Sequence, residues 1–370
     1  MSNVNDFVII DGVLKRYTGT DAEVVIPDGV TQIDDAFNRC IWLKSVNIPD
    51  SVTKIGRWAF SHCTSLTSIN IPDSVTVIGP YAFSDCTSLT SITISNAVMK
   101  IDGSVFGGCT SLIGIDVKEE NRHYVSIDGN LYRKKGKTLI QYANGKKATS
   151  FEIPDYVTEI GPSAFYGCTS LTSITIPNSV TKIGSSAFSG CTSLTSITIP
   201  QGVTRLEWGA FRQCENLESA VIPASVTKIE QEAFNLCWKL SRLEIYGSPK
   251  IANYSFEGIQ LSFFKAPELV ATNGFAWWRE RFGEVNTYIA AFDNFDVGSK
   301  IAKYAKRCYE DAFRALVVRD RIDLIPNFLS MWKKFDMDVF ERLVSIANCE
   351  QKIEFSAFLL NWKNDFISKN

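Results

Sequence analysis

The chain has 370 residues, of which 45% are hydrophobic and 21% charged, and its net charge at pH 7 is −2. This composition is typical of a folded globular protein and excludes a disordered chain, and the near-zero charge gives no general attraction to nucleic acid or to anionic membranes. Because no apolar run approaches the roughly 20 residues of a membrane helix and the first residues lack the basic and apolar regions of a secretion signal, we expect a cytoplasmic protein, or a secreted or cell-surface one if a leader was removed.

The first predicted element is a β-hairpin near the N-terminus. Residues 7–17 read FVIIDGVLKRY, so that Asp11 and Gly12 stand between two apolar runs. An Asp-Gly pair in this position is a strong signal for a two-residue hairpin turn. We expect residues 1–25 to form a cap at the start of the repeats that follow.

Eight cysteines then recur at a fixed spacing. Every interval is 23 residues except one of 59, which is 23 plus an insertion of 36, and the residues are Cys40, Cys63, Cys86, Cys109, Cys168, Cys191, Cys214 and Cys237. A fixed period of this size predicts a stack of identical supersecondary units, a solenoid. Since a cysteine at the same position of every unit marks a structural position, we expect these thiols to be free and buried in the core.

The repeat unit, or rung, is clearest over residues 48–70, IPDSVTKIGRWAFSHCTSLTSIN. Residues 66–71 end in alternating apolar and polar side chains, which predicts a half-buried strand, and Pro72 stops that strand because it cannot donate a ladder hydrogen bond. Ala59 and Phe60 mark a short helical or 3₁₀ turn on the opposite side. We therefore expect an α/β solenoid with a curved parallel sheet, its turns on the convex side, and a core column of Phe37, Phe60, Phe83, Phe106, Phe165, Phe188, Phe211, Phe234 and Phe256.

The insertion, residues 118–152, repeats the theme of the N-terminal hairpin. Residues 124–132 read YVSIDGNLY, and Asn144-Gly145 follows, so we expect one or two hairpins that project from the sheet or extend it. The insertion is also the most basic stretch of the chain. It supplies candidate partner-binding residues, namely Lys134, Lys135, Lys146 and Lys147. The alternative is that these lysines only solvate the hairpin and protect its edges.

After about residue 270 the period changes from 23 residues to three and four. Apolar residues at that spacing predict an amphipathic helix from Ser299 onward, and they are Ile301, Ala305, Cys308, Ala312 and Leu316. We expect residues 1–270 to form the solenoid and residues 271–370 a small all-α C-terminal domain that also covers the last rung.

The rungs resemble the BspA-like class of leucine-rich repeats, which runs C-x-x-L-x-x-I-x-I-P-x-x-V-x-x-I-x-x-x-A-F. The resemblance covers roughly residues 25–265 and includes the eight cysteines in register. It implies a curved leucine-rich repeat solenoid, and bacterial surface members of the class act as adhesins or host-matrix binders. This chain departs from those members because it shows no export signal and no wall-sorting tail.

An enzymatic reading finds little support in the sequence. The two histidines, His62 and His123, exclude a histidine-rich metal site and leave few general bases. His62 precedes Cys63, but a rung cysteine should face the core, and no motif resembles a nucleophile elbow or a P-loop. We expect no catalytic residue, no cofactor and no metal.

Binding is the better-supported class of function. Strand residues between the inward Leu and Ile should face the concave surface, and in most rungs they are Ser, Thr or Asn, as in Ser91 and Thr93. Rungs within 201–245 depart from this pattern and supply the remaining candidate partner-binding residues, Arg205, Trp208, Arg212, Arg242 and Glu244, types that include the Trp and Arg favoured in protein hot spots. Trp58 and Tyr81 also share one position in adjacent rungs, outside the core columns. The alternative is that this divergence reflects capping by the helical domain.

The sequence thus predicts a non-enzymatic, protein-binding or adhesion-type repeat module with a protein partner and no nucleic acid. The alternative is an intracellular scaffold in which the helical tail binds the partner, and an enzyme of unknown type is a distant third.

Overall fold

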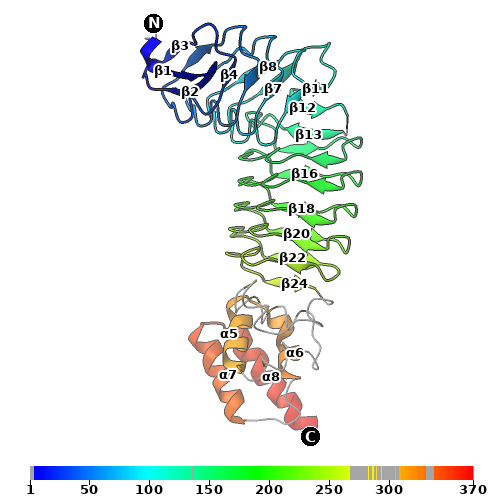
Figure 1. Cartoon of the computed structure of the whole chain (residues 1–370). Coiled ribbons are helices and arrows are strands. Elements are labelled where there is room, and N and C mark those ends of the chain that lie inside the picture. Colours follow the sequence, from blue (N-terminus) through cyan, green and yellow to red (C-terminus); the bar gives the residue numbers. More distant parts are fainter. Residues whose placement is uncertain are drawn as a thin grey trace.

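A computed structural model describes residues 4–135, 137–266, 308–330 and 337–369, together with Phe282, Asn286, Ile289, Asp293 and Ala305. The chain forms an elongated solenoid followed by a small helical region (Figure 1). The start of the helix predicted from Ser299 lies outside the described residues. Within them, no helix is both long enough and apolar enough to cross a bilayer.

Each rung has three sides, two of which are short parallel strands. The first kind, the Ser-Ile-Thr strands, comprises β3 (Glu23–Val25), β5 (Ser45–Asn47), β8 (Ser91–Ile94), β10 (Gly114–Val117), β14 (Ser150–Glu152), β16 (Ser173–Thr175), β18 (Ser196–Thr198), β20 (Ser219–Ile222), β22 (Arg242–Ile245) and β24 (Phe263–Lys265). Neighbours pair in parallel at the repeat spacing, so that Ile115 lies beside Ile92. The fixed sequence period thus becomes a fixed register.

The second kind, the Lys-Ile strands, lies on the next side of the rung and forms two sheets, one in each half of the solenoid. It comprises β4 (Gln32–Ile33), β6 (Lys54–Ile55), β7 (Val77–Ile78), β9 (Lys100–Ile101), β15 (Glu159–Ile160), β17 (Lys182–Ile183), β19 (Arg205–Leu206), β21 (Lys228–Ile229) and β23 (Lys250–Ile251). Each isoleucine or leucine points into the core while the first residue of the strand is partly or fully exposed.

The third side is the Ala-Phe turn, where the chain reverses direction tightly. Two residues per turn have positive φ, 53° at Trp58 and 56° at His62. Hydrogen bonds of the 3₁₀ type close the turn, from Ser61 N to Trp58 O at 3.1 Å and from Cys63 N to Phe60 O at 3.2 Å. The predicted 3₁₀ turns are therefore confirmed.

The core is built from the predicted columns. The rings of Phe60 and Phe83 stack with their centroids 5.5 Å apart and their planes within 2°. The rung cysteines are buried and unbridged, and the thiol of Cys63 donates a hydrogen bond to the Phe37 carbonyl at 3.1 Å. Cysteine suits this position because it is a small hydrophobe that also satisfies a buried carbonyl.

The insertion starts a second solenoid in the same way as the N-terminus starts the first. The N-terminal hairpin consists of β1 (Phe7–Ile10) and β2 (Val13–Tyr17), preceded by the 3₁₀ helix η1 (Val4–Asp6), and the insertion contains β11 (Tyr124–Ile127), β12 (Asn130–Arg133) and β13 (Thr138–Gln141). Both hairpin turns are Asp-Gly pairs with positive φ at both residues. Tyr17 stacks near Phe37 at 5.3 Å and Tyr142 near Phe165 at 5.2 Å, so that a tyrosine begins each phenylalanine column.

The buried side chains accordingly form two hydrophobic clusters. One runs from Leu14 to Leu131 and the other begins at Tyr132 and continues through the second half. We call residues 7–117 the first unit and residues 138–265 the second unit. The predicted hairpin extends the sheet rather than projecting from it, because β13 pairs in parallel with β15.

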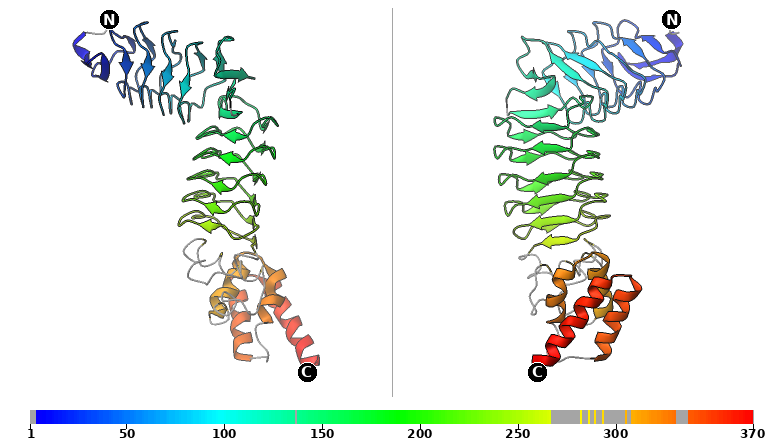
Figure 2. Two further views of the ribbon diagram at one scale, coloured as in Figure 1. Left: turned by 45° about the vertical axis from the view of Figure 1, so that its right-hand side comes forward. Right: turned by 180° about the vertical axis from the view of Figure 1, so that it is seen from behind.

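The solenoid changes direction where the two units meet, near β11–β13 (Figures 1 and 2). On the Lys-Ile side β13 pairs with β15 and the hairpin β11–β12 adds two further strands beyond it. On the Ala-Phe side the units touch directly, with Ser104 Oγ 2.8 Å from Ser163 Oγ and a hydrogen bond from Gly108 N to Tyr166 O at 3.2 Å. The insertion therefore acts as a wedge. The turns were predicted on the convex side, but at this bend they lie on the inside.

Gly108 permits the close approach at the bend. Its φ is +76°, and a Cβ atom there would lie 2.2 Å from Asp85 Oδ1 and 3.2 Å from the Tyr166 ring. Only glycine avoids both the strained backbone and the clash.

The C-terminal region is helical and shares the core of the second unit. Its described helices are α5 (Tyr309–Val318), the 3₁₀ helix η2 (Ile322–Leu324), α6 (Ile325–Leu329), α7 (Met337–Cys349) and α8 (Ile353–Lys369). Buried side chains from these helices, such as Phe313 and Leu343, belong to the same hydrophobic cluster as the last rungs.

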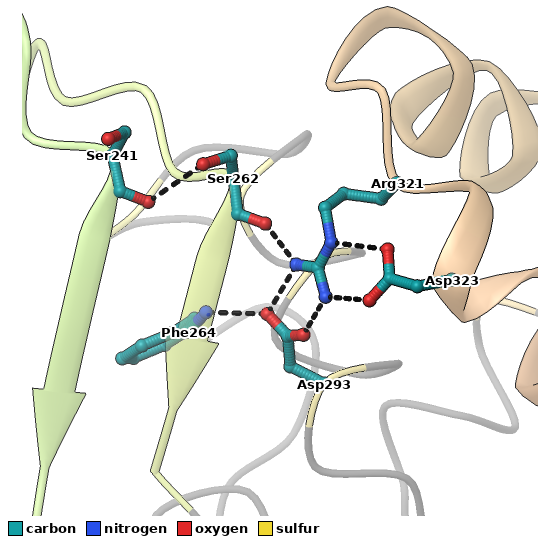
Figure 3. Close-up of polar contacts among 6 residues, drawn as sticks. All are labelled: Ser241, Ser262, Phe264, Asp293, Arg321 and Asp323. Carbon is teal, nitrogen blue, oxygen red and sulfur yellow. Dashed lines mark hydrogen bonds and ion pairs between the residues drawn. The ribbon is translucent and has the colours of Figure 1, made fainter.

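Polar side chains from the C-terminal region satisfy the free edge of the last rung, as Figure 3 shows. Asp293 Oδ2 accepts a hydrogen bond from Phe264 N at 2.5 Å, and Arg321 joins Asp293, Asp323 and the Ser262 carbonyl. Burial raises the pKa of the Asp293 carboxyl, and Arg321 opposes that rise. The helical region therefore covers the last rung, as predicted.

We expect Arg321→Ala to lower the free energy of unfolding by about 1–3 kcal/mol, because it leaves the Asp293 carboxylate buried without its cation. Hydrogen exchange of residues 259–266 should speed up in the same variant. Arg342→Ala is the control, since its ion pair with Glu310 is exposed and its loss should leave the free energy of unfolding almost unchanged. Equal effects of the two substitutions would show that Arg321 does not hold the cap in place.

Candidate functional site

The Ser-Ile-Thr face carries small hydroxyl side chains over most of its length. In β16, Ser173 and Thr175 are exposed on either side of buried Ile174, and β18 repeats the pattern with Ser196 and Thr198. A surface that is the same in successive rungs offers little to fix the position of a partner. Its small hydroxyls are also poor candidates for hot spots.

This face changes character at its C-terminal end. We call the side chains there, Arg242, Glu244, Tyr246, Phe263 and Lys265, the terminal patch. Arg242 pairs with Phe263 across the strands, and its guanidinium lies 4.0 Å from the centre of that ring. Arg242 also donates to Glu244 Oε1 at 2.8 Å.

Glu244 is the centre of the terminal patch. Tyr246 OH donates a hydrogen bond to Glu244 Oε2 at 2.7 Å. This hydrogen bond lowers the pKa of the Glu244 carboxyl, and Arg242 lowers it further. Lys265 lies 3.2 Å from Tyr246 OH and 5.0 Å from the centre of its ring. The patch therefore combines fixed charges with two aromatic surfaces.

The other candidates from the diverged rungs lie on different sides of the solenoid. Arg205 sits in β19 on the Lys-Ile side, where it pairs with Glu207 at 3.3 Å and with Glu230, which also binds Lys228. These residues form a row of ion pairs in which each positive charge has a carboxylate partner. Trp208 and Arg212 lie on the Ala-Phe side, with the guanidinium 5.9 Å from the centre of the indole ring. The structure thus does not bring the five candidates together.

The four candidate lysines of the insertion have different environments. Lys146 is half-buried and donates to Asn130 Oδ1 at 2.9 Å and to the Asp128 carbonyl, so it braces the hairpin turn, and burial lowers its pKa. Lys134 donates to the Asn121 carbonyl at 2.6 Å. Lys135 and Lys147 are exposed. Two of the four therefore have a structural role.

A cleft of about 300 Å³ lies on the inside of the bend. We call it the corner cleft. Its first-unit wall carries Trp58 and Tyr81, with ring centroids 6.4 Å apart, and its second-unit wall carries Tyr166, Trp208 and Arg212. The cleft is lined by Ala-Phe turns of both units, and the outermost of them lie two rungs away from the bend on each side. The Ala-Phe faces of the two units therefore converge at the bend.

The floor of the corner cleft is polar. Ser84 Oγ donates to Asp85 Oδ2 at 2.8 Å, and His62 Nδ1 lies 3.8 Å from the same oxygen. Burial raises the pKa of the Tyr166 hydroxyl. Sequence reasoning placed Trp58 and Tyr81 at one position of adjacent rungs, but it did not join them to Trp208, since that requires the bend.

The described residues offer no constellation typical of catalysis. No group of three or more His, Cys, Asp or Glu side chains among them is arranged to hold a metal ion. Cys63 is completely buried, and its thiol donates to the Phe37 carbonyl rather than to exposed His62. Burial also raises the pKa of Cys86 to about 12, which opposes formation of a nucleophilic thiolate.

Comparisons with known proteins agree on the type of repeat. A family described as the BspA type leucine rich repeat region matches residues 17–133 and 141–270 in six copies. A leucine-rich repeat protein from Eubacterium ventriosum is 25% identical over 70% of this chain and 87% of its own, with a TM-score of 0.55. The pneumococcal vaccine antigen PcpA is 21% identical over 71% and 86%, with a TM-score of 0.49. No curated protein sequence matches the chain.

Proposed function

The chain belongs to the BspA-type leucine-rich repeat family, and from this premise we propose that it is a non-enzymatic, protein-binding repeat module that uses the terminal patch. The observation that carries the proposal is the change in the Ser-Ile-Thr face at β22 and β24. Arg242 stacks on Phe263 there, next to Tyr246. Arg and Tyr are among the residues enriched in protein hot spots.

The terminal patch is also prepared for binding. Glu244 holds Arg242 and Tyr246 by hydrogen bonds, so a partner would meet side chains that are already ordered. Less conformational entropy is then lost on association. The uniform rungs, such as those of β16 and β18, present exposed serine and threonine side chains instead.

An adhesion-type role at a cell surface and an intracellular scaffold role are both compatible with this patch. One observation favours a contribution from the helical tail. Ile353 and Leu360, seven residues apart in α8, are 79% and 48% exposed and lie on one helical face. We therefore keep partner binding by α8 as the second candidate.

Site-specific photo-crosslinking in the full chain distinguishes these surfaces. A photoreactive phenylalanine analogue is placed at Tyr246 in the patch, at Thr198 in the uniform face or at Leu360 in α8. The proposal expects one partner protein to be captured at Tyr246 and not at Thr198. Capture at Leu360 alone would favour the helical tail.

Binding of that purified partner should then depend on Arg242. We expect Arg242→Ala to weaken binding by at least about 1–2 kcal/mol, whereas Thr198→Ala and Ser91→Ala should have almost no effect. The Arg242 side chain is 54% exposed, so the melting temperature should fall only slightly. Titration calorimetry in which the hydroxyl residues dominate would reject the terminal patch.

A further inference from the structure

We propose that the corner cleft binds a neutral saccharide. This second site does not rest on the protein-binding proposal, because the terminal patch lies on the Ser-Ile-Thr side and the cleft on the Ala-Phe side. The sequence places the aromatic residues of the cleft in separate rungs, and the wedge formed by the insertion brings them to face one another.

The first-unit wall of the cleft holds two exposed aromatic side chains at a repeat position whose residue type varies from rung to rung. Trp58 and Tyr81 are 36% and 39% exposed and have φ values of 53° and 59°. The same position is serine at Ser163 and Ser186. Positive φ recurs at this position in every rung and belongs to the Ala-Phe turn, so it is the size of the two side chains, and not their backbone, that distinguishes them. Trp208, 42% exposed, lies on the opposite wall.

Backbone groups around the cleft are already paired. His62 N donates to Ser84 O and Asp85 N to Gly107 O, both at 2.8 Å, and Gly108 N donates to Tyr166 O. A peptide bound in extended form needs a free strand edge, which these turns do not present. A ligand in the cleft would instead meet side chains.

Those side chains match a sugar ring on both of its surfaces. The apolar C–H face of a pyranose can stack on Tyr81, on Trp208 or on the face of Trp58 that Arg57 does not cover. Its hydroxyl rim both donates and accepts, and the floor supplies partners for both, since serine hydroxyls and Gln213 donate and accept while Asp85 accepts. A cleft of about 300 Å³ lies at the lower end of the range for small-molecule sites and accommodates one or two sugar units.

The charges around the cleft balance, which favours a neutral ligand. Arg212 Nε lies 3.1 Å from Glu232 Oε2, and Arg57 lies over the Trp58 ring at 3.7 Å. With Asp85 in the floor, two cations face two carboxylates. An anionic ligand would have to displace Glu232 from Arg212, and a cationic one would have to approach Arg57.

Ligand-observed saturation-transfer NMR on the full chain tests the proposal. The probes are maltose, cellobiose, lactose, mannobiose and chitobiose, with sialyllactose as the anionic comparison. We expect transfer to the C–H protons of at least one neutral disaccharide and weaker transfer to sialyllactose. Trp58→Ala and Trp208→Ala should each weaken its affinity by about tenfold or more.

Trp42→Ala is the matched control, because Trp42 is 38% exposed and lies outside the cleft. It should leave binding unchanged. Asp85→Asn, which preserves the shape of the side chain, should also weaken binding, and it serves as the test if either tryptophan variant is poorly folded. Absence of transfer from every neutral sugar, or transfer that survives the cleft substitutions, would overturn the proposal. If a photoreactive residue at Tyr81 captured a polypeptide while no sugar bound, the cleft would be a peptide site instead.

Discussion

Replacing Phe83 with alanine should lower the free energy of unfolding of the first unit by about 3–5 kcal/mol. Phe83 is completely buried, and its ring stacks between those of Phe60 and Phe106 at 5.5 and 5.6 Å. The substitution leaves a cavity between two rungs, and the stacked geometry prevents the neighbouring rings from closing it. Urea unfolding followed by circular dichroism measures the loss.

The same substitution should separate the unfolding of the two halves. Stability in a solenoid is approximately a sum of rung terms and nearest-neighbour interfaces, and the buried residues of this chain form two clusters. Phe83→Ala should therefore give a broadened or biphasic transition, with faster hydrogen exchange in residues 7–117. Phe211→Ala is the matched control and should affect the second unit. An unshifted, equally sharp transition would contradict the assignment of Phe83 to the core.

The rungs could be predicted because their determinants are local and repeated. The 23-residue spacing of cysteine and phenylalanine specifies the phase of each side chain, and that phase decides which residues stack. The Asp-Gly pairs at Asp11 and Asp128 were sufficient to predict both hairpins, since a two-residue turn depends mainly on the two residues that form it.

The corner cleft could not be predicted because it depends on contacts between distant segments. Trp58 and Trp208 line one cleft because the solenoid bends at β11–β13, where Gly108 lies close to Asp85 and Tyr166. The environment of Lys146 likewise could not be predicted from the sequence. Its charge suggested a binding residue, and the structure adds a bracing role, because its ammonium group donates a hydrogen bond to the Asp128-Gly129 turn.

The rung thiols should make the first unit sensitive to alkaline pH. The ordinary pKa of a cysteine thiol is 9.0, whereas burial raises the pKa of Cys40 to about 11 and that of Cys86 to about 12. Burial also raises the pKa of Cys63 and Cys109 well above the ordinary value. Between pH 9 and 11 the unfolded chain loses these protons while the folded chain keeps them. Since the folded state then binds more protons, stability falls as pH rises.

We therefore expect the free energy of unfolding of the first unit to fall above about pH 9 with a slope that approaches roughly 5.5 kcal/mol per pH unit, because each of the four thiols contributes about 1.4 kcal/mol. A domain stable by about 5–15 kcal/mol would unfold within one to three pH units of that threshold. Urea titrations at pH 8, 9, 9.5 and 10 measure the slope. Replacing Cys63 and Cys109 by alanine removes their hydrogen bonds to Phe37 and Phe83, at about 1 kcal/mol each, and should halve the slope. A slope that is flat in the native sequence, or equal in the double variant, would show that the thiols ionise without unfolding the rungs.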